Sequence, residues 1–244
     1  MLLQLSTWPE IEDYLNTKSS IIIPIGSTEQ HGPNGLVGTD AICAEKIAHG
    51  VGEKTNTLVA PTVNVGMAQH HMAFPGSMTL RPSTLLAVVT DIINSLGHHG
   101  FTHLFFINGH GGNVPTVNAA FAEFYALNNL RDRREIYCKV INWWTMPEVG
   151  KLSKKYFGAA EGGHATPSEV SVTWYAYPET VNQTTLSPTI APSGSFYDAT
   201  DFRNKFPDGR IRSNPGLATK DIGKELYHAA VDGLSDQLSH FLSN

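Results

Sequence analysis

Apolar residues along this chain gather in short runs that alternate with amphipathic stretches. The run that begins at Ile21 is β-branched and apolar, and it breaks at Pro24 and Gly26 into a loop rich in glycine. Residues 102–107 form a second apolar run that also passes into a glycine-rich loop. Short runs of this kind, bounded by glycine or proline, are typical of buried strands. The pattern therefore predicts two buried strands, each followed by a polar loop.

The helices predicted between the strands carry apolar residues at a spacing near that of an α-helix. Thr7 and Glu10 have the form of a capping box and start a first short helix, and Ser83 starts a strongly amphipathic one. Further helices are expected at about 40–50, 117–124, 166–175 and 219–242, and extended segments at 58–65 and 135–142. Beyond Trp143 the pattern weakens, and 184–216 is expected to be a loop region rich in proline and serine. This alternation predicts an α/β fold, with a mostly parallel central sheet flanked by helices on both faces in three layers.

Length and composition exclude several classes of protein. The 244 residues suffice for one large domain, and no linker or repeat divides 1–244. No apolar run approaches the roughly 20 residues that cross a bilayer. The N-terminus lacks the basic and apolar regions of a secretion signal, so we expect a cytoplasmic protein outside membranes. The formal net charge is −5, and the one basic run, 131–134, is interrupted by Asp132, which argues against a nucleic-acid partner.

Four side chains in the two glycine-rich loops are candidate metal ligands. Glu29 and His31 are two positions apart, so on extended backbone they share a face, and Asp40 lies further along the same loop. His110 lies in the loop after the second strand. Because ligands bind at the carboxyl ends of parallel strands, we expect both loops to face one crevice. A mixed set of nitrogen and oxygen ligands suits zinc, manganese or a related divalent ion, and open coordination positions would make the site catalytic.

Each of these side chains also has a purely structural interpretation. Asp40 has the position of a helix N-cap, Glu29 could be a solvated loop acid, and His31 could be a hydrogen-bonded turn residue. The glycines around His110 could instead cradle a phosphate, but the orders Gly-x-Gly-x-x-Gly and Gly-Lys-Ser/Thr are absent. The histidine in the middle of that loop is better explained as a ligand. Taken together, the four side chains favour a metal site.

Two further groups of side chains are candidates for the same site. Glu169 completes a capping box with Thr166, which by itself accounts for it, yet His164 and Glu169 flank a helix start and can both point at one site. That arrangement suits a proton shuttle beside a metal ligand. Serine hydrolase chemistry is not supported, because Gly-x-Ser-x-Gly is absent. The polar loop 66–80 carries three residues that either contact a substrate or form a packed turn, namely His70, His71 and Ser77.

Several motifs in the same order along the chain give a specific family resemblance. Residues 24–33 are Pro-Ile-Gly-Ser-Thr-Glu-Gln-His-Gly-Pro, and the motifs at 38–40, 74–77, 108–113 and 164–169 follow. With these motifs the chain resembles the creatininase (creatinine amidohydrolase) family over nearly its whole length. The resemblance implies a metal-dependent amidohydrolase, usually a homohexamer, with two divalent ions that are zinc, manganese or iron. It also implies that Glu29, Asp40 and His110 hold one ion, while His31 and a bridging Asp40 hold the other.

The chain departs from the family pattern at one informative place. Creatininase itself has a Tyr-Glu pair after the histidine of the Gly-His loop, and that glutamate binds the second ion. Here those positions are Gly111 and Gly112, so Glu169 is the obvious replacement ligand and Gly111 is left as a substrate contact. The implied reaction is hydrolysis of a C–N bond in a small cyclic amide by a hydroxide that the ions activate, with His164 passing a proton to the departing nitrogen.

Two other functions stay open from the sequence. One is a deformylase-like hydrolase that acts on a formamido-pyrimidine nucleotide, for which Arg81 is the only hint of a phosphate pocket. The other is a metal- or nucleotide-binding module without turnover. The nucleotide enzyme is expected to have a basic phosphate pocket. Metal analysis followed by an amide-substrate screen separates the three functions, because absence of metal favours the binding module and a phosphate-dependent substrate preference favours the nucleotide enzyme.

Overall fold

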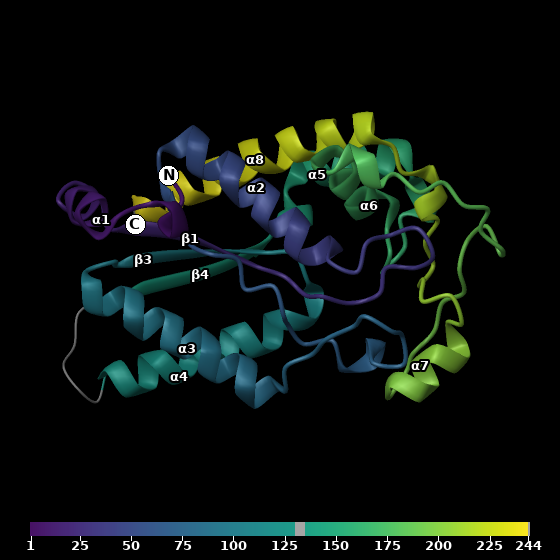
Figure 1. The fold of residues 1–244 in the computed structure, drawn as a ribbon, viewed down its shortest axis with the longest axis horizontal. Helices are drawn as coiled ribbons and strands as arrows, with labels where there is room; N and C mark the ends of the chain where they lie inside the picture. The colour runs from purple at the N-terminus through teal and green to yellow at the C-terminus, as the bar shows by residue number, and fades with distance from the viewer. Residues whose placement is uncertain (130–134, 244) are drawn as a thin grey trace.

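A parallel sheet of four strands crosses the protein, and its strand order differs from the chain order (Figure 1). The strands are β1 (Ser20–Ile25), β2 (Leu58–Val59), β3 (His103–Asn108) and β4 (Tyr137–Asn142), arranged β2-β1-β3-β4. β1 and β3 pair along their whole length, from Ser20 opposite His103 to Ile25 opposite Asn108. The computed structural model describes residues 1–129 and 135–243, so the basic run at 131–134 lies outside the described residues.

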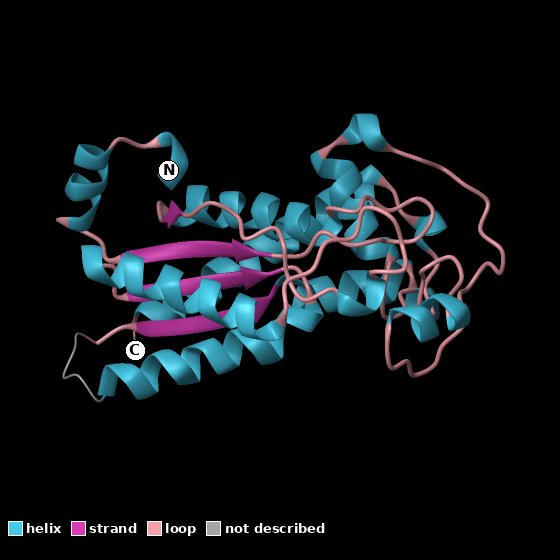
Figure 2. Cartoon of the chain, turned by 60° about the horizontal axis from the view of Figure 1, so that its bottom comes forward, coloured by secondary structure: helices cyan, strands magenta, loops and turns pink. Residues whose placement is uncertain are grey.

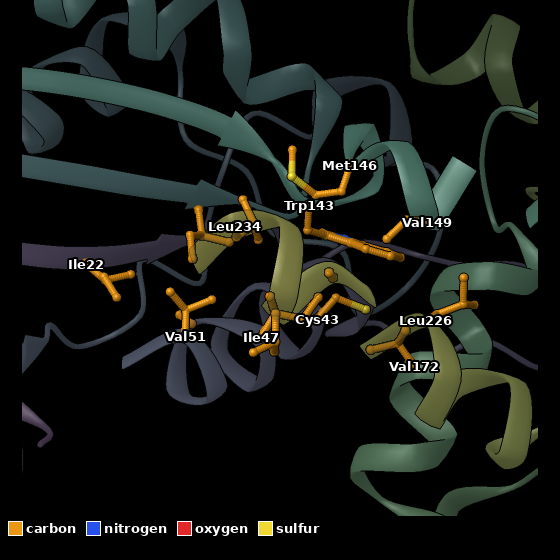
Figure 3. Packing of buried hydrophobic residues seen from close by; sticks show 14 of the residues in the cluster. Ile22, Cys43, Ile47, Val51, Trp143, Met146, Val149, Val172, Leu226 and Leu234 are labelled. Atoms are coloured by element: carbon orange, nitrogen blue, oxygen red, sulfur yellow. The ribbon is translucent and has the colours of Figure 1, made fainter. Parts of the chain in front are cut away.

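Helices cover both faces of the sheet. In chain order they are α1 (Trp8–Leu15), α2 (Thr39–Thr55), α3 (Pro82–His99), α4 (Val114–Asn129), α5 (Pro147–Tyr156), α6 (Pro167–Ala176), α7 (Ala199–Lys205) and α8 (Lys220–Leu242). Because strand side chains alternate between faces, Ile22 and Phe105 pack with α2, α5 and α8, whereas Ile23 and Phe106 pack with α3 and α4. Figure 1 shows these helices on opposite sides of the strands, and Figure 3 shows the first of the two cores from close by. The three-layer α/β prediction is confirmed.

The chain reverses its direction across the sheet after β2, and this reversal positions the candidate site. α2 leads from β1 to β2 on one face, whereas α3 and then α4 lead to β3 and β4 on the other face. The loops that leave β1 and β3 therefore diverge to opposite faces from two neighbouring strands. In open α/β sheets such a switch point, at the carboxyl ends of the strands, is where ligands bind. Figure 2 shows the arrowheads of the strands pointing to the end of the molecule where the long loops gather.

Three predicted segments differ from the structure. The extended segment expected at 58–65 forms a strand over only two residues, because one extra residue interrupts the register between the Ile22–Val59 pair and the isolated bridge of Ile25 to Val63. The weak pattern after Trp143 contains a helix, α5, which buries only Val149 and so carries little apolar periodicity. The loop region 184–216 contains the short helix α7, whose first turn is capped by Asp198. Among the described residues, no helix is both long and apolar enough to cross a bilayer.

Candidate metal centre

The first turn of α2 lies directly against the ends of β1 and β3. A Cβ atom on Gly109 would stand 2.0 Å from the carbonyl oxygen of Asp40, and one on Gly26 would stand 2.4 Å from the backbone nitrogen of Ala41. Real side chains do not tolerate such distances, so glycine at both strand ends allows this close approach of the backbones. As a result Asp40, in the first turn of α2, lies between the loops that leave the two strands.

Asp40 directs its two carboxylate oxygens at two different histidines. Its Oδ2 atom is 3.0 Å from Nδ1 of His110, and its Oδ1 atom is 3.1 Å from Nε2 of His31. A backbone carbonyl holds each ring from behind: His110 Nε2 donates to Met67 over 2.8 Å, and His31 Nδ1 donates to Glu29 over 3.0 Å. Such bonds fix the orientation of the ring and the nitrogen that faces a ligand. Asp40 is therefore placed as a bridge between two groups of donors.

A second carboxylate completes each group. Glu29 Oε1 lies 3.3 Å from His110 Nδ1, and on the other side Glu169 Oε1 lies 3.8 Å from His31 Nε2. Ligand atoms of Glu29, Asp40 and His110 all lie within 4.8 Å of one another, and the same holds for His31, Asp40 and Glu169. The structure thus brings the predicted ligands together in two sets that share Asp40.

The donor set fits divalent cations. Glu29 Oε1 and Asp40 Oδ2 are buried, and the nearest described ring nitrogens that face them belong to His71 and His110, at 3.0 to 3.3 Å. Glu29 Oε2, by contrast, accepts a hydrogen bond of 2.8 Å from Ser27, which leaves the other oxygen for the site. Buried carboxylates are costly unless cations, either protonated histidines or metal ions, neutralise them. Two carboxylates and one histidine in each set match the mixed nitrogen and oxygen ligands of zinc and manganese sites.

Burial and close contact shift the pKa values of these side chains. Burial raises the pKa of Glu29 to about 7, and the charge of Asp40 adds to the effect. Burial alone would also raise the pKa of Asp40, but His31 and His110 outweigh it and lower that pKa. Burial opposes protonation of the histidines, yet the carboxylates prevail and raise the pKa of His31 to about 10 and that of His110 to about 9. The metal-free site therefore holds two protonated rings, whose protons a bound metal ion would displace.

Glu169 caps α6 and at the same time faces His31. Its Oε1 accepts the backbone N–H of Thr166 over 2.5 Å, and the Thr166 hydroxyl accepts the N–H of Glu169, so the capping box is formed. The same carboxylate faces His31. A side chain at Gly112 would place its Cβ atom 2.4 Å from His110 Nε2. A larger side chain at position 112 therefore has no room on this backbone. The carboxylate that lies beside His31 comes from α6 instead, as Glu169.

Gln30, which was not among the predicted site residues, forms hydrogen bonds with the histidines around this site. Its side-chain amide donates to the carbonyl of Gly209 and to Nδ1 of His71, each over 2.9 Å. Nε2 of His164 lies 2.8 Å from the backbone carbonyl of Gln30 and 2.9 Å from its side-chain nitrogen. Because the two amide hydrogens are already given to Gly209 and His71, His164 Nε2 is the donor to the carbonyl, which leaves a lone pair on Nδ1, 3.8 Å from Glu29 Oε1. Burial and the neighbouring His71 lower the pKa of His164 well below its ordinary value, so this ring is neutral. The one sequence signal for Gln30 is its place between two predicted ligands.

The predicted substrate contacts lie in two different places. A cavity of about 590 Å³ opens beside the ligand sets, and its lining includes His70, His71 and Gly111. Ser77 is outside that lining, and its hydroxyl accepts the backbone N–H of Gln30 over 3.1 Å. His71 also supports the ligand set, because its Nε2 atom lies 3.2 Å from Glu29 Oε1. Ser77 is thus placed to support the loop of Glu29 and His31 from behind.

Other residues of the lining carry no sequence motif. Trp144 follows β4, Glu161 precedes the His164 motif by three positions, and Phe196 lies in the segment before α7. Only a folded chain brings them to one cavity, because they belong to loops and short turns. Arg81 is the N-cap residue of α3 and is not part of the lining, which contains neither Lys nor Arg among the described residues. The sequence hint of a phosphate pocket is therefore not borne out at this cavity.

Comparison with known proteins gives matches along almost the whole chain. The family model described as creatininase, creatinine amidohydrolase, matches residues 4–238. Creatinine amidohydrolase of Pseudomonas putida is 25% identical over 250 residues, which cover 95% of this chain and 94% of that protein. A 3-dehydro-scyllo-inosose hydrolase of Thermotoga maritima is 27% identical over 185 residues, 74% of this chain and 57% of the relative. A mycofactocin precursor peptide peptidase of Mycolicibacterium smegmatis is 34% identical over 108 residues, 42% of this chain and 43% of the relative. The chain thus spans about half the length of the last two relatives.

Solved structures share the fold. A mutant creatininase in complex with creatine superposes with a TM-score of 0.89 at 21% identity, over 98% of this chain and 97% of that chain. A manganese form of creatininase gives a TM-score of 0.86 at 22% identity, and a mutant zinc form gives 0.85 at 20% identity, with the same coverage. At these identities the similarity establishes the arrangement of the sheet and its helices.

Proposed function

This chain belongs to the creatininase family, and from that premise we propose that it is a metal-dependent hydrolase that cleaves a C–N bond in a small cyclic amide. One observation carries the proposal: Asp40 presents one carboxylate oxygen to His31 and the other to His110. A carboxylate in that position is suited to bridge two cations. The burial of the Glu29 and Asp40 carboxylates among histidine nitrogens supports the same conclusion.

Two sets of residues would hold the ions. Glu29, Asp40 and His110 would hold the first, and His31, Asp40 and Glu169 the second. Manganese or zinc suits this set by chemistry, and both occur in the creatininase structures that share the fold. When bound, two such ions lower the pKa of water and polarise a substrate carbonyl. The protein holds the carboxylates of Glu29, Asp40 and Glu169 close to the two histidines, beside the carboxyl ends of β1 and β3.

His164 is placed to move the proton that amide hydrolysis requires. Its Nε2 atom is committed to the carbonyl of Gln30, so its Nδ1 atom is the one free to accept a proton. That atom faces Glu29 and the ligand sets. Because the pKa of this ring is lowered, a proton that reaches Nδ1 is held weakly and can pass to the nitrogen that leaves when the C–N bond breaks. Gln30 would act as a positioning residue, because its backbone carbonyl selects the tautomer of His164.

The lining of the cavity bears on the substrate. Its ionisable side chains are carboxylates and histidines, and the described lining residues include no cation that would pair with a phosphate. This favours an uncharged amide over a formamido-pyrimidine nucleotide. The Pseudomonas putida relative, which matches over nearly its full length, acts on creatinine by name, so a cyclic amide of similar size is the substrate we propose. A hexameric assembly, a single domain over 1–244 and a cytoplasmic location stay predictions.

Metal analysis followed by an amide screen tests the proposed function. We expect two divalent ions per chain and hydrolysis of cyclic amides, with activity lost after chelation and restored by manganese or zinc. Full activity in a metal-free preparation would contradict the metal-dependent mechanism. Metal binding without turnover of any amide would favour a binding module. A strict requirement for a phosphate group on the substrate would favour the nucleotide enzyme.

A further inference from the structure

The cavity extends well past the candidate ligands. Besides Asp40 and Glu169, its lining includes Gly111, Trp144 and two residues of α5, Gly150 and Ser153. Building on the proposed function, the geometry points to a distal subsite, bounded by Gly111, Gly150 and Ser153, that receives a planar uncharged substituent of the substrate amide. The reacting amide would lie at the ligand sets and the substituent would lie toward α5.

The glycines of this subsite are not required by the backbone. A Cβ atom on Gly150 would meet nothing within 4 Å, and on Gly111 it would meet only Trp144, at 3.9 Å. Gly163, also in the lining, would place a Cβ atom 3.9 Å from Ile211. Both distances are ordinary contacts, and none of the three glycines has a left-handed φ. What their missing side chains provide is open space in the cavity.

Two other glycines in the same lining show the contrast. Gly162 has φ 77° and would place a Cβ atom 2.6 Å from the backbone of Arg212. Gly112 would place one 2.4 Å from His110 Nε2. Glycine at these two positions is explained by conformation and packing alone. Gly111, Gly150 and Gly163 lack that explanation, so their effect on cavity space is the feature that distinguishes them.

The chemistry of the walls selects the kind of substituent. Trp144, Phe196 and Ile211 supply apolar surface, and Ser153 supplies one hydroxyl. Aromatic rings pack well on such surfaces, since they bury a large area and stack on other rings. A volume of about 590 Å³ falls within the range of about 300–1,000 Å³ that holds drug-sized ligands. The cavity therefore has room for a ring beyond the reacting amide.

Two hydroxamates that share one metal-binding head test the subsite. Acetohydroxamate carries a methyl group and benzohydroxamate carries a phenyl ring, so the ratio of their dissociation constants reports the space beyond the ions. On the metal-loaded protein we expect benzohydroxamate to bind at least tenfold more tightly. Gly150→Leu should remove most of this preference while leaving acetohydroxamate binding unchanged. Leucine favours helices more than glycine does, so the variant should fold.

A matched control places the same side chain elsewhere on the helix. Lys151→Leu adds leucine at the next position of α5, about 100° around the helix axis and outside the cavity lining, and should keep the full preference. Gly111→Ala gives a second narrowing of the cavity, to be used if Gly150→Leu melts early in a thermal scan. It should reduce the preference by a smaller factor.

The outcomes separate the subsite from the metal centre. If acetohydroxamate binds but the phenyl ring adds no affinity, the distal subsite is overturned and the metal centre stands. If Gly150→Leu and Gly111→Ala both keep the wild-type preference, the subsite is again overturned. If neither hydroxamate binds to protein incubated with manganese or zinc, the proposed metal centre fails and the subsite fails with it.

Discussion

The first ligand set takes Glu29 and His110 from the loops that directly follow β1 and β3, whereas the second set takes Glu169 from the start of α6. The Glu29 side chain is fully buried and that of Glu169 is 15% exposed. Nitrogens of His71 and His110 lie 3.2 and 3.3 Å from Glu29 Oε1, while Glu169 Oε1 accepts the backbone N–H of Thr166. The first set thus has an oxygen that histidine rings face, and the second shares its oxygen with a helix cap.

From this difference we expect the two positions to differ in their affinity for a metal ion. A fully buried carboxylate gains more from a neutralising cation than a partly exposed one does, so the first position should bind its ion more tightly. In the second position the Glu169 oxygen already accepts the backbone N–H of Thr166. A metal ion must compete with this hydrogen bond, which lowers its affinity. Asp40 belongs to both positions, so it is the residue through which one change affects the whole centre.

The largest effect is expected from Asp40→Ala. If Asp40 bridges the ions, the variant should bind none, and amide hydrolysis should fall by more than the about 10–100-fold that loss of an outer-shell partner costs. The metal-free protein should lose about 3–5 kcal/mol of stability, because His31 and His110 stay buried without their carboxylate. Metal content by mass spectrometry and thermal unfolding give both values.

An exposed acid provides the control for that variant. Asp232 pairs with Lys54 at the surface, and Asp232→Ala should leave metal content and stability nearly unchanged. Loss of a single ion from Asp40→Ala, with the other retained, would reject the bridging role.

The comparison of the two sets is sharpened by a pair of matched substitutions. Glu29→Gln should remove the ion of the first set, and Glu169→Gln that of the second, so each variant should retain one ion per chain. Gln also fits a capping box, so Glu169→Gln should keep the α6 cap and change the unfolding free energy little. Glu169→Ala, by contrast, should lose the ion and about 1 kcal/mol of helix capping as well. Two ions bound to Glu169→Gln would show that Glu169 is a cap alone.

The smallest effect is a dependence of metal affinity on pH that differs between the sets. His31 and His110 have pKa values of about 10 and about 9 in the metal-free site, so at neutral pH each ion must displace one proton. Acid favours the protonated, metal-free form, and affinity should fall about tenfold for each pH unit lost. Burial and the charge of Asp40 raise the pKa of Glu29 to about 7, so below that pH the first position must displace a second proton and its affinity should fall more steeply.

Metal titrations at pH 8, 7 and 6 on the two single-ion variants measure this dependence. Glu169→Gln reports the first position and Glu29→Gln the second. Equal slopes for both variants below pH 7 would show that Glu29 is not a ligand that has to lose a proton.

Much of the fold follows from local patterns in the sequence. The run at Ile21 is buried on both faces, and period-two alternation alone assigns Ile22 and Ile23 to different cores. α1 begins where its capping box predicts, whereas α3 begins at Pro82 with Arg81 as its N-cap residue, so the prediction that Ser83 caps this helix was wrong. α5 and α7 escaped prediction because each buries few side chains, and a helix held by few core contacts leaves little apolar pattern.

The sequence by itself determined the chemical inventory: a carboxylate and a histidine after one buried strand, a histidine after another, and a carboxylate at a helix start. It also determined that both strands end in glycine, which lets the backbone of α2 approach them. Only the tertiary structure decided that Asp40 faces both histidines, that Glu169 caps α6 and faces His31 at once, and that Gln30 holds the rings around them. Caps and strand ends depend on neighbours in the chain, whereas a shared ligand depends on distances between loops that the packing of the sheet and its helices fixes.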